Sequence, residues 1–312
     1  MGTPDFAVAS LDAIVQAGLH VVGVITAPDK PAGRGMKMTG SAVKNYALDN
    51  GLNILQPEKL KNPAFIEELK LLKADLQIVV AFRMLPEVVW DMPPMGTVNL
   101  HGSLLPQYRG AAPINWAIIN GEKQTGVTTF KLQHDIDTGN ILLQEPISIG
   151  DDETASELHD RMKEIGAKLV VQTIKGLSGG LLKETPQAQL VDLPKSLSHG
   201  NDQPKSLKHA PKIFTETCKI DWTRNVNEVY DLIRGLSSYP GAFTYLNGKI
   251  LKIFRARKED EIANQPGNYE TDKKSFLQFA CNGGSISVTE IQLEGKKKMT
   301  VEEFLRGYQH VL

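Results

Sequence analysis

Short β-rich segments alternate with segments of helical periodicity in the first half of the chain, and this alternation limits the possible folds most. Apolar, β-branched segments predict strands at residues 20–27, 76–82 and 96–101. A period near 3.6 predicts helices at residues 7–18, 41–51 and 62–74. Strands that alternate with helices usually pair in parallel, because each helix carries the chain back across the sheet. We therefore expect an α/β domain with a doubly wound, mostly parallel sheet.

The chain then continues with two strands and one long helix before its character changes. Residues 126–133 and 141–149 predict strands joined by a polar turn, and residues 156–177 predict a long amphipathic helix. Prolines among polar residues, with no sustained period, predict a linker at residues 183–204. The first domain is accordingly expected at residues 1–182.

Residues 205–312 predict a second domain of another kind. Short apolar strands between Gly or Asn turns are expected at 217–222, 242–248, 250–258, 275–281 and 285–293. One helix, at residues 225–236, lies near their start. Many short strands at close spacing are typical of a β-barrel, so we expect a small barrel here and not a continued parallel sheet.

Charge is divided unevenly between the two domains. The 312 residues carry a formal net charge of -1. Residues 205–312 hold 17 Lys and Arg against 13 Asp and Glu, so the second domain is mildly basic and the remainder is acidic. A basic domain suits an anionic macromolecular partner. An ordinary solvated surface with uneven charge explains the same numbers equally well.

Cysteine usage and hydropathy narrow the class of protein. Cys218 and Cys281 are far apart and outside any C-x-x-C spacing, which argues against a disulfide framework and against a zinc site. No apolar run approaches the ~20 residues that span a bilayer, and no basic segment precedes an apolar signal sequence. We expect a cytoplasmic protein with no membrane partner and no metal.

Residues 99–118, NLHGSLLPQYRGAAPINWAI, show little helical or strand periodicity beyond their first residues. Asn99 and His101 are two residues apart on a predicted strand, so their side chains share a face. They lie at the carboxyl end of that strand, where open α/β sheets place their ligands. Histidine can transfer a proton near neutral pH, and asparagine can donate a hydrogen bond to an oxyanion. A purely structural histidine is nevertheless the commoner case at a strand end.

A carboxylate that could act with His101 lies in the turn DIDTGN. Asp135 and Asp137 are equal candidates on chemistry alone, and either could simply form an Asx turn. Ser103 suggests a hydrolase nucleophile, but HGSLL lacks the second glycine of a G-x-S-x-G elbow. The residues therefore indicate an acid–base or oxyanion site and leave the choice of carboxylate open.

Several segments, in order, resemble the methionyl-tRNA formyltransferase family. They are MGTPDFAVASLDAI, APDKPAGRG, NLHGSLLPQYRGAAPINWAI, DIDTGNIL and, past the linker, HAPKIFTETCKIDW, so the resemblance covers nearly the whole chain. The block HGSLLPxxRGxxP is specific to enzymes that use 10-formyltetrahydrofolate, but it does not alone separate the tRNA enzyme from its relatives. The resemblance implies a Rossmann-like formyltransferase domain followed by an OB-like β-barrel domain that binds tRNA.

This resemblance also implies a reaction and its catalytic residues. It assigns the family's Asn, His and Asp to Asn99, His101 and Asp137, which selects Asp137 over Asp135. The formyl group of 10-formyltetrahydrofolate would pass to the amino group of initiator methionyl-tRNA. Asn99 and protonated His101 would stabilise the oxyanion of the tetrahedral intermediate, and Asp137 would adjust the protonation of the histidine. Neither a metal nor a covalent nucleophile is required, and we expect a monomer.

Binding residues follow from the same resemblance. Four consecutive residues line the folate pocket in the family: Ser103, Leu104, Leu105 and Pro106. For the two leucines alone, burial in the core would be the simpler expectation. Arg34 and Lys37 belong to a basic, glycine-bearing loop that approaches the tRNA acceptor end in the family. The lysine run at 296–298 resembles an ordinary solvated turn and is given only a weak role.

Two features depart from the family pattern. Family members carry a short strand before MGTPDF, and this chain starts at that loop, so we expect the first strand to be absent near the centre of the sheet. Arg83, within AFRMLP, stands where relatives usually have a small residue. Its effect on folate contacts is therefore left open.

Three other functions share parts of this pattern. Formyltransferases that act on glycinamide ribonucleotide or on amino sugars use the same motif, but the first resembles the N-terminal domain alone. A formyltetrahydrofolate hydrolase would use water and would need no macromolecular surface. A non-catalytic RNA-binding protein would not need the set Asn99, His101 and Asp137.

Overall fold

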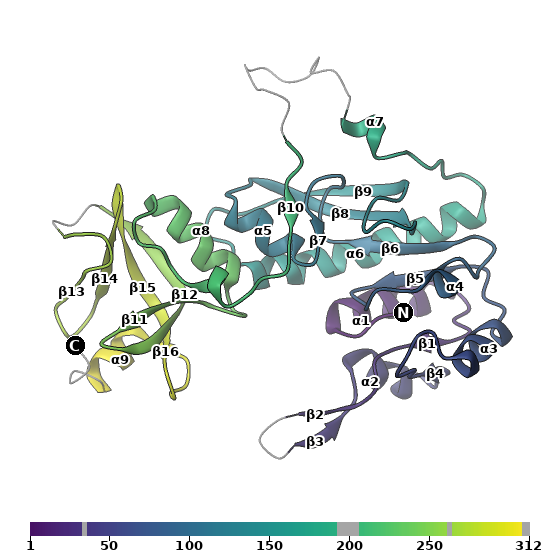
Figure 1. The fold of residues 1–312 in the computed structure, drawn as a ribbon, viewed down its shortest axis with the longest axis horizontal. Helices are drawn as coiled ribbons and strands as arrows, with labels where there is room; N and C mark the ends of the chain where they lie inside the picture. The colour runs from purple at the N-terminus through teal and green to yellow at the C-terminus, as the bar shows by residue number, and fades with distance from the viewer. Residues whose placement is uncertain (33–35, 192–205, 261–263, 308–312) are drawn as a thin grey trace. The chain divides into compact units, whose positions relative to one another are not determined.

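Two units divide the chain, and each collects several segments of sequence (Figure 1). The computed structural model describes residues 1–32, 36–191, 206–260 and 264–307. Unit 1 comprises Met1–Arg109, Gly126–Ile147 and Asp160–Lys208, and unit 2 comprises Gly110–Thr125, Ser148–His159 and His209–Leu312. Most of the predicted linker, residues 192–204, lies outside the described residues, and the boundaries predicted for the two domains stay a prediction. Within the described ranges, no helix is both long and apolar enough to cross a bilayer.

Unit 1 is an α/β structure with mixed strand pairing, which confirms the predicted class. Its main sheet has the order β5 (Gln77–Val80), β6 (Thr97–His101), β8 (Gln124–Lys131) and β9 (Ile141–Ser148). β5 and β6 run parallel, as do β1 (Val24–Ile25) and β4 (Ile54–Leu55). β8 instead runs antiparallel to β6, so parallel pairing is confined to the first strands of the unit.

The first two residues of the chain lie between β1 and β5. Gly2 donates its N–H to the carbonyl of Ile25 at 3.1 Å, and Val80 donates to the carbonyl of Met1 at 2.9 Å. Gly2 and Val80 form a parallel bridge. An apolar hollow of about 50 Å³ adjoins this segment, lined by side chains of α1, β1 and β5 that include Ile14 and Ile78.

The helices of unit 1 begin at residues suited to that position. They are α1 (Asp5–Gln16), α2 (Ala42–Asp49), α3 (Pro63–Leu71), α4 (Glu87–Trp90), most of α6 (Ala155–Ser178) and α7 (Ala188–Val191). Ser41 caps α2 by accepting the N–H of Lys44, and Asn62 caps α3 in front of Pro63. α6 lies against β6 at Gly166, where an added Cβ would be 2.8 Å from a methyl carbon of Leu100. α4 and α7 were not predicted, because a single turn leaves no periodic signal.

Unit 2 contains a curled, six-stranded antiparallel sheet (Figure 1). Its strands are β11 (Ala242–Leu246), β12 (Lys249–Glu259), β15 (Gly284–Leu293), β14 (Leu277–Cys281) and β13 (Tyr269–Thr271) in spatial order, with β16 (Met299–Thr300) beside β15. The helices α5 (Pro113–Ile119), α8 (Val226–Leu236) and α9 (Val301–Gly307) belong to the same unit. α8 packs against β12 and β15, and Ile233, Leu251 and Ile291 are almost completely buried in its core.

One predicted strand of this unit is wrong. Residues 217–222 were expected to be extended, but a short 3₁₀ helix, η1 (Glu216–Cys218), occupies their start. Lys219 then forms only an isolated bridge with Phe243. Cys218, Ile220 and Trp222 are all buried, so the alternating pattern reflects a segment lying on the core and not a hydrogen-bonded ladder.

Replacing Phe279 with Ala should strongly destabilise unit 2. Phe279 is 1% exposed, and its ring stacks on Trp222 with centroids 4.7 Å apart and planes 10° apart. Truncating a buried Phe typically costs about 3–5 kcal/mol of unfolding free energy. Phe214→Ala is the control, since that ring is 58% exposed. Denaturant unfolding monitored by tryptophan fluorescence measures both, and equal midpoints for the two variants would contradict this packing.

Candidate active site

The carboxyl end of β6 places Asn99 and His101 on one face of the main sheet, because side chains two residues apart on a strand share a face. Asn99 pairs with Phe130 on β8, and His101 pairs with Thr128 on the same strand. Asn99 is half-buried, whereas His101 is only 6% exposed. The local sequence TVNLH thus forms the strand that the periodicity predicts, and its last residue lies at the edge of the core.

Both nitrogens of the His101 ring face hydrogen-bond acceptors. Nε2 lies 2.9 Å from the main-chain carbonyl of Tyr108, which can only accept, so Nε2 carries a proton. Nδ1 lies 3.8 Å from Oδ2 of Asp137, which is an ion-pair distance and longer than a hydrogen bond. The His101 ring also makes an edge-to-face contact with the Phe130 ring, with the ring centroids 6.4 Å apart and the ring planes at 82° to each other. Nδ1 is therefore the ring nitrogen that faces the carboxylate.

Asp137, and not Asp135, lies beside His101. The side chain of Asp137 is 14% exposed, and its backbone takes the left-handed conformation at φ 54°. Aspartate tolerates that conformation better than most residues. The side chain of Asp135 is 84% exposed, and its carboxylate lies 3.9 Å from Nδ1 of His134. The structure thus brings one of the two candidate carboxylates to the candidate histidine.

Buried hydrogen bonds hold the turn that follows β6. The Thr128 hydroxyl donates to the carbonyl of Ser103 at 2.6 Å and accepts the N–H of Leu105 at 3.2 Å. The Gln144 side-chain amide donates to the carbonyl of Leu105 and to the Thr128 hydroxyl, both at 2.9 Å. Sequence reasoning missed Thr128 and Gln144, because a polar residue within a strand gives no sign of its partner. These bonds set the shape of the chain at 103–106.

The four residues predicted to line a pocket differ in accessibility. Ser103 is fully buried and Leu105 is 2% exposed, so neither residue offers a surface to a ligand in this structure. Leu105 belongs to a core cluster with Phe130 and Ile141, as expected for a leucine alone. Leu104 and Pro106 are partly exposed.

A hairpin carries the predicted basic loop. β2 (Lys30–Ala32) pairs with β3 (Lys37–Thr39) in antiparallel fashion, and the side chain of Lys37 is exposed at the start of β3. Met36 and Met38 on either side of it are 70% and 62% exposed. Arg34 lies outside the described residues. The proposed role of both cations therefore stays a prediction.

Arg83 is engaged with the main chain between β4 and α3. Its guanidinium donates to the carbonyl oxygens of Pro57 and Glu58, the latter at 2.8 Å. The guanidinium carbon also lies 5.5 Å from the centre of the Phe82 ring. In this position Arg83 stabilises a loop, which explains how a large cation is accommodated there.

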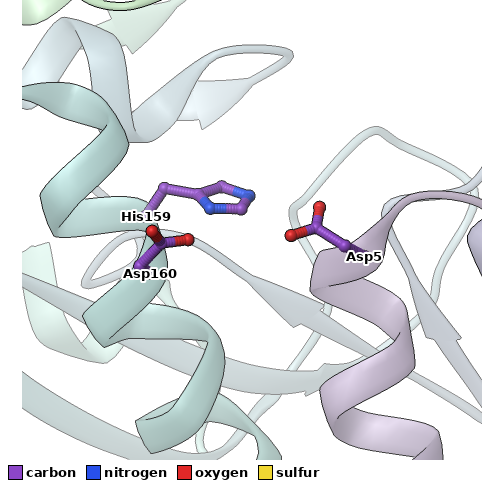
Figure 2. Close-up of side chains that lie close together, drawn as sticks. All are labelled: Asp5, His159 and Asp160. Carbon is purple, nitrogen blue, oxygen red and sulfur yellow. The ribbon is translucent and has the colours of Figure 1, made fainter.

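A further group of titratable side chains lies on α1 and α6 (Figure 2). Asp5 begins α1, and Asp160 follows His159 on α6. The Lys163 ammonium lies 3.3 Å from Asp5 and 3.2 Å from Asp160, so one cation already pairs with both carboxylates. Hydrogen bonding to Asp160, against a smaller opposing effect of burial, raises the pKa of Lys163. The carboxylates are mostly exposed, and we interpret the group as a surface ion-pair cluster.

Comparisons with known proteins agree with one another. Residues 1–174 match the family Formyl transferase, and residues 212–309 match Formyl transferase, C-terminal domain. The chain is 51% identical to Methionyl-tRNA formyltransferase of Bacteroides fragilis over 99% of this chain and 94% of the relative. It is 52% identical to Methionyl-tRNA formyltransferase of Parabacteroides distasonis over 100% of this chain and 95% of that one.

Among solved structures, the fold is similar to that of WlaRD, a sugar 3N-formyl transferase crystallised with dTDP and 5-N-formyl-THF. The TM-score is 0.64 at 21% identity, covering 95% of this chain and 97% of that one. At this identity the likeness concerns the fold alone.

Thr128→Val should destabilise unit 1 by removing a hydroxyl that serves three partners. A buried polar group left without a partner typically costs about 1–3 kcal/mol, and both Ser103 and Leu105 would lose one. Thr125→Val, also on β8, is the control, because the Thr125 hydroxyl is buried with no hydrogen-bond partner among the described residues. That change should be neutral or stabilising. Denaturant midpoints test the pair, and a Thr125→Val loss as large as that of Thr128→Val would contradict the assignment.

Proposed function

Given that this chain belongs to the methionyl-tRNA formyltransferase family, we propose that it formylates initiator methionyl-tRNA with 10-formyltetrahydrofolate as the donor. The chain is an enzyme of the formyltransferase class, and its product would be N-formylmethionyl-tRNA for translation initiation. The observation that carries the proposal is His101 Nδ1 facing Asp137 at 3.8 Å, with Asn99 on the same face of β6.

The proposed reaction is an acyl transfer in which charge develops on one oxygen. The methionine amino group attacks the formyl carbon, the new C–N bond forms, and the formyl oxygen becomes an oxyanion. The amine then loses a proton, the bond between the formyl carbon and N10 of the folate breaks, and N10 takes up a proton. Groups that donate hydrogen bonds to the oxyanion stabilise the transition state more than the substrate and so accelerate the step.

Asn99 and His101 supply those donors in this proposal. The amide of Asn99 is a neutral donor, and the imidazolium of His101 is a charged and therefore stronger one. An imidazolium has two N–H groups: the one at Nε2 donates to the Tyr108 carbonyl, and the one at Nδ1, 3.8 Å from the Asp137 carboxylate and beyond hydrogen-bond distance, is the one that would donate to the oxyanion. Asp137 balances the charge of the ring and assists the proton movements. The turn at 103–106 would form a wall for the flat pterin of the folate through Leu104 and Pro106, its two partly exposed residues.

The tRNA would be bound by phosphate contacts in two places. Arg34 and Lys37 would meet the acceptor end. In unit 2, a cavity of about 480 Å³ between α8 and β12 is lined by four cationic residues: Arg234, Arg255, Arg257 and Lys258. Cations that contact phosphates position an RNA without reading its sequence.

The contacts of these four cations separate structural roles from binding roles. Arg234 is 4% exposed and donates to Asp231 and to two main-chain carbonyls, so it is structural. Arg255 pairs with Glu157. Arg257 is exposed, and Lys258 is held by Asn227 at 2.8 Å and by the ring of Tyr230. Arg257 and Lys258 are the pair that can face a phosphate.

Tyr230 contributes a neutral hydroxyl to the wall of this cavity. Burial, together with the hydrogen bond from its hydroxyl to Asp152 at 2.7 Å, raises the pKa of Tyr230. The hydroxyl therefore stays protonated over the whole physiological range, and its partner Asp152 is the acidic residue that lines this cavity beside the cations.

The remaining assignments go with this function. They are a Rossmann-like formyltransferase domain at 1–182, a linker at 183–204, an OB-like tRNA-binding barrel at 205–312, a monomeric state, no metal and a cytoplasmic location. Sequence identity near 50% to tRNA enzymes, against 21% to the sugar enzyme, supports tRNA over the amino-sugar alternative.

Asn99→Ala should slow formyl transfer by about 10²- to 10³-fold, the usual loss for one oxyanion donor. Asp137→Asn should also lower turnover, because a neutral amide no longer balances the imidazolium. Asp135→Asn is the matched control and should retain the rate, since Asp135 is exposed and lies beside His134. Single-turnover rates with charged tRNA measure all three. A slow Asp135→Asn beside a normal Asp137→Asn would show that the carboxylates are assigned the wrong way round.

Arg257→Ala should weaken methionyl-tRNA binding and reduce the slope of log K against log salt by about 1, the expected change for one lost phosphate contact. Lys297→Ala is the control, because Lys297 is an exposed residue of the turn after β15. Binding measured over a salt series compares the two. If the slope of log K against log salt is the same for the parent and for Arg257→Ala, the cavity of unit 2 is ruled out as a phosphate site.

A further inference from the structure

The loop that carries Asp137 has no regular structure of its own, so something must hold it in place. Asp137 has a positive φ, and the loop turns so tightly that a Cβ on Gly139 would lie 1.6 Å from the carbonyl oxygen of Lys131. A glycine is therefore required there, but a glycine also adds freedom in place of rigidity. The interactions that fix this loop come from residues 184–187.

We propose that Gln187 is a positioning residue for catalysis, which holds the main chain of Asp137 so that its carboxylate faces His101. The Gln187 side chain is 3% exposed. Its Nε2 donates to the carbonyl of Asp137 at 2.8 Å and to the carbonyl of Gly139 at 2.9 Å. One amide group thus uses both of its N–H donors on two carbonyls of the same loop. The inference rests on the proposed function, because it assigns Gln187 a role through Asp137.

Arg109 fixes the orientation of this amide. Nε and Nη2 of Arg109 donate to Oε1 of Gln187, at 3.0 Å and 2.6 Å. A guanidinium can only donate and a carbonyl can only accept. The reversed amide would place its NH₂ group against the guanidinium and its oxygen against two carbonyls. Only one orientation of Gln187 satisfies all four contacts, so the side chain is locked by its partners.

The residues just before Gln187 attach the same segment to both ends of the loop. Thr185 and Ile141 exchange two main-chain hydrogen bonds, at 2.8 Å and 2.9 Å. The Glu184 carboxylate accepts from Lys131 at 2.6 Å and from Asn140 at 3.0 Å, and these bonds, that to Lys131 first, lower the pKa of Glu184. Residues 184–187 therefore run along the loop as a strap, with Gln187 at the catalytic aspartate.

The folate side of the site does not depend on this strap. Thr128 and Gln144 hold the turn at 103–106 by hydrogen bonds. In the part of the chain that the structure describes, the side-chain amide of Gln187 donates to the loop of Asp137 and Gly139 and not to this turn. A change at Gln187 should therefore affect turnover and leave the KM for the folate donor nearly unchanged. A displacement of about 1 Å in a catalytic group can cost on the order of 10²-fold in rate.

Gln187→Glu tests the proposal with little change of shape. The carboxylate keeps the acceptor for Arg109 but has no donor for the carbonyls of Asp137 and Gly139. We expect kcat to fall by about 10- to 100-fold, with the folate KM within about twofold of the parent value. Gln189→Glu is the matched control, because Gln189 is exposed on α7 two residues away, and it should keep the parent kcat. Circular dichroism establishes the folded fraction to which each rate is normalised.

A double-mutant cycle with Asp137→Asn separates a positioning role from a general loss of structure. If Gln187 acts through Asp137, the double variant should be slower than Asp137→Asn alone by less than about twofold, because residues that act as one unit are not additive. The inference is overturned if the two losses of kcat multiply in the double variant. It is also overturned if Gln187→Glu keeps the parent kcat, or if Gln189→Glu loses as much kcat as Gln187→Glu.

The same cycle shows where a failure lies. A normal rate for Asp137→Asn would refute the proposed role of Asp137, and with it the role of Gln187, whereas a slow Asp137→Asn with multiplying losses refutes the role of Gln187 alone. If Gln187→Glu does not fold, Arg109→Lys takes its place in the cycle. It leaves Gln187 intact but removes the fork that orients it, and the same pattern of rates decides.

Discussion

The pairing of His101 with Thr128 across β6 and β8 is the constraint on which the rest of the candidate site depends. It places the histidine at the strand end, and it places the Thr128 hydroxyl under the turn that follows, where it bonds to Ser103 and Leu105. A shift of β8 by one residue in this register would turn the Thr128 side chain to the opposite face of the sheet. The buried residues around it, such as Phe130, make such a shift costly because they would then face away from the core.

Much of this arrangement can be predicted from the sequence, for reasons that are local. The run TVNLH ends a buried strand, and the two-residue spacing puts Asn99 and His101 on one face. The choice of Asp137 over Asp135 is not local: it needed the family resemblance, and in the structure it depends on a backbone turn that brings only one carboxylate to the histidine. Thr128, Gln144 and Gln187 could not be predicted, because the partners of a buried polar residue can lie far along the chain, as Arg109 lies 78 residues from Gln187.

The elements that were predicted wrongly, or not predicted, from the sequence have a common physical cause. Residues 217–222 alternate in burial, but they lack a neighbouring strand over most of their length. α5 and α9 have seven residues each, which is too short for a reliable period, and β13 and β16 are shorter still. Residues 184–187 have the composition of a linker, yet their hydrogen bonds attach them to the loop that carries Asp137. The composition of a segment indicates its average exposure to solvent, whereas the roles of the segments named here depend on individual contacts.

The most direct measurement follows the formyl carbon itself. The protein is incubated with 10-formyltetrahydrofolate labelled in the formyl group and with methionyl-tRNA, and the label is located after digestion of the RNA. We expect the label to appear on the methionine amino group, with one tetrahydrofolate formed for each formyl-methionine. Label recovered as free formate at the same rate with or without the tRNA would contradict it, because that result belongs to a hydrolase that uses water as the acceptor.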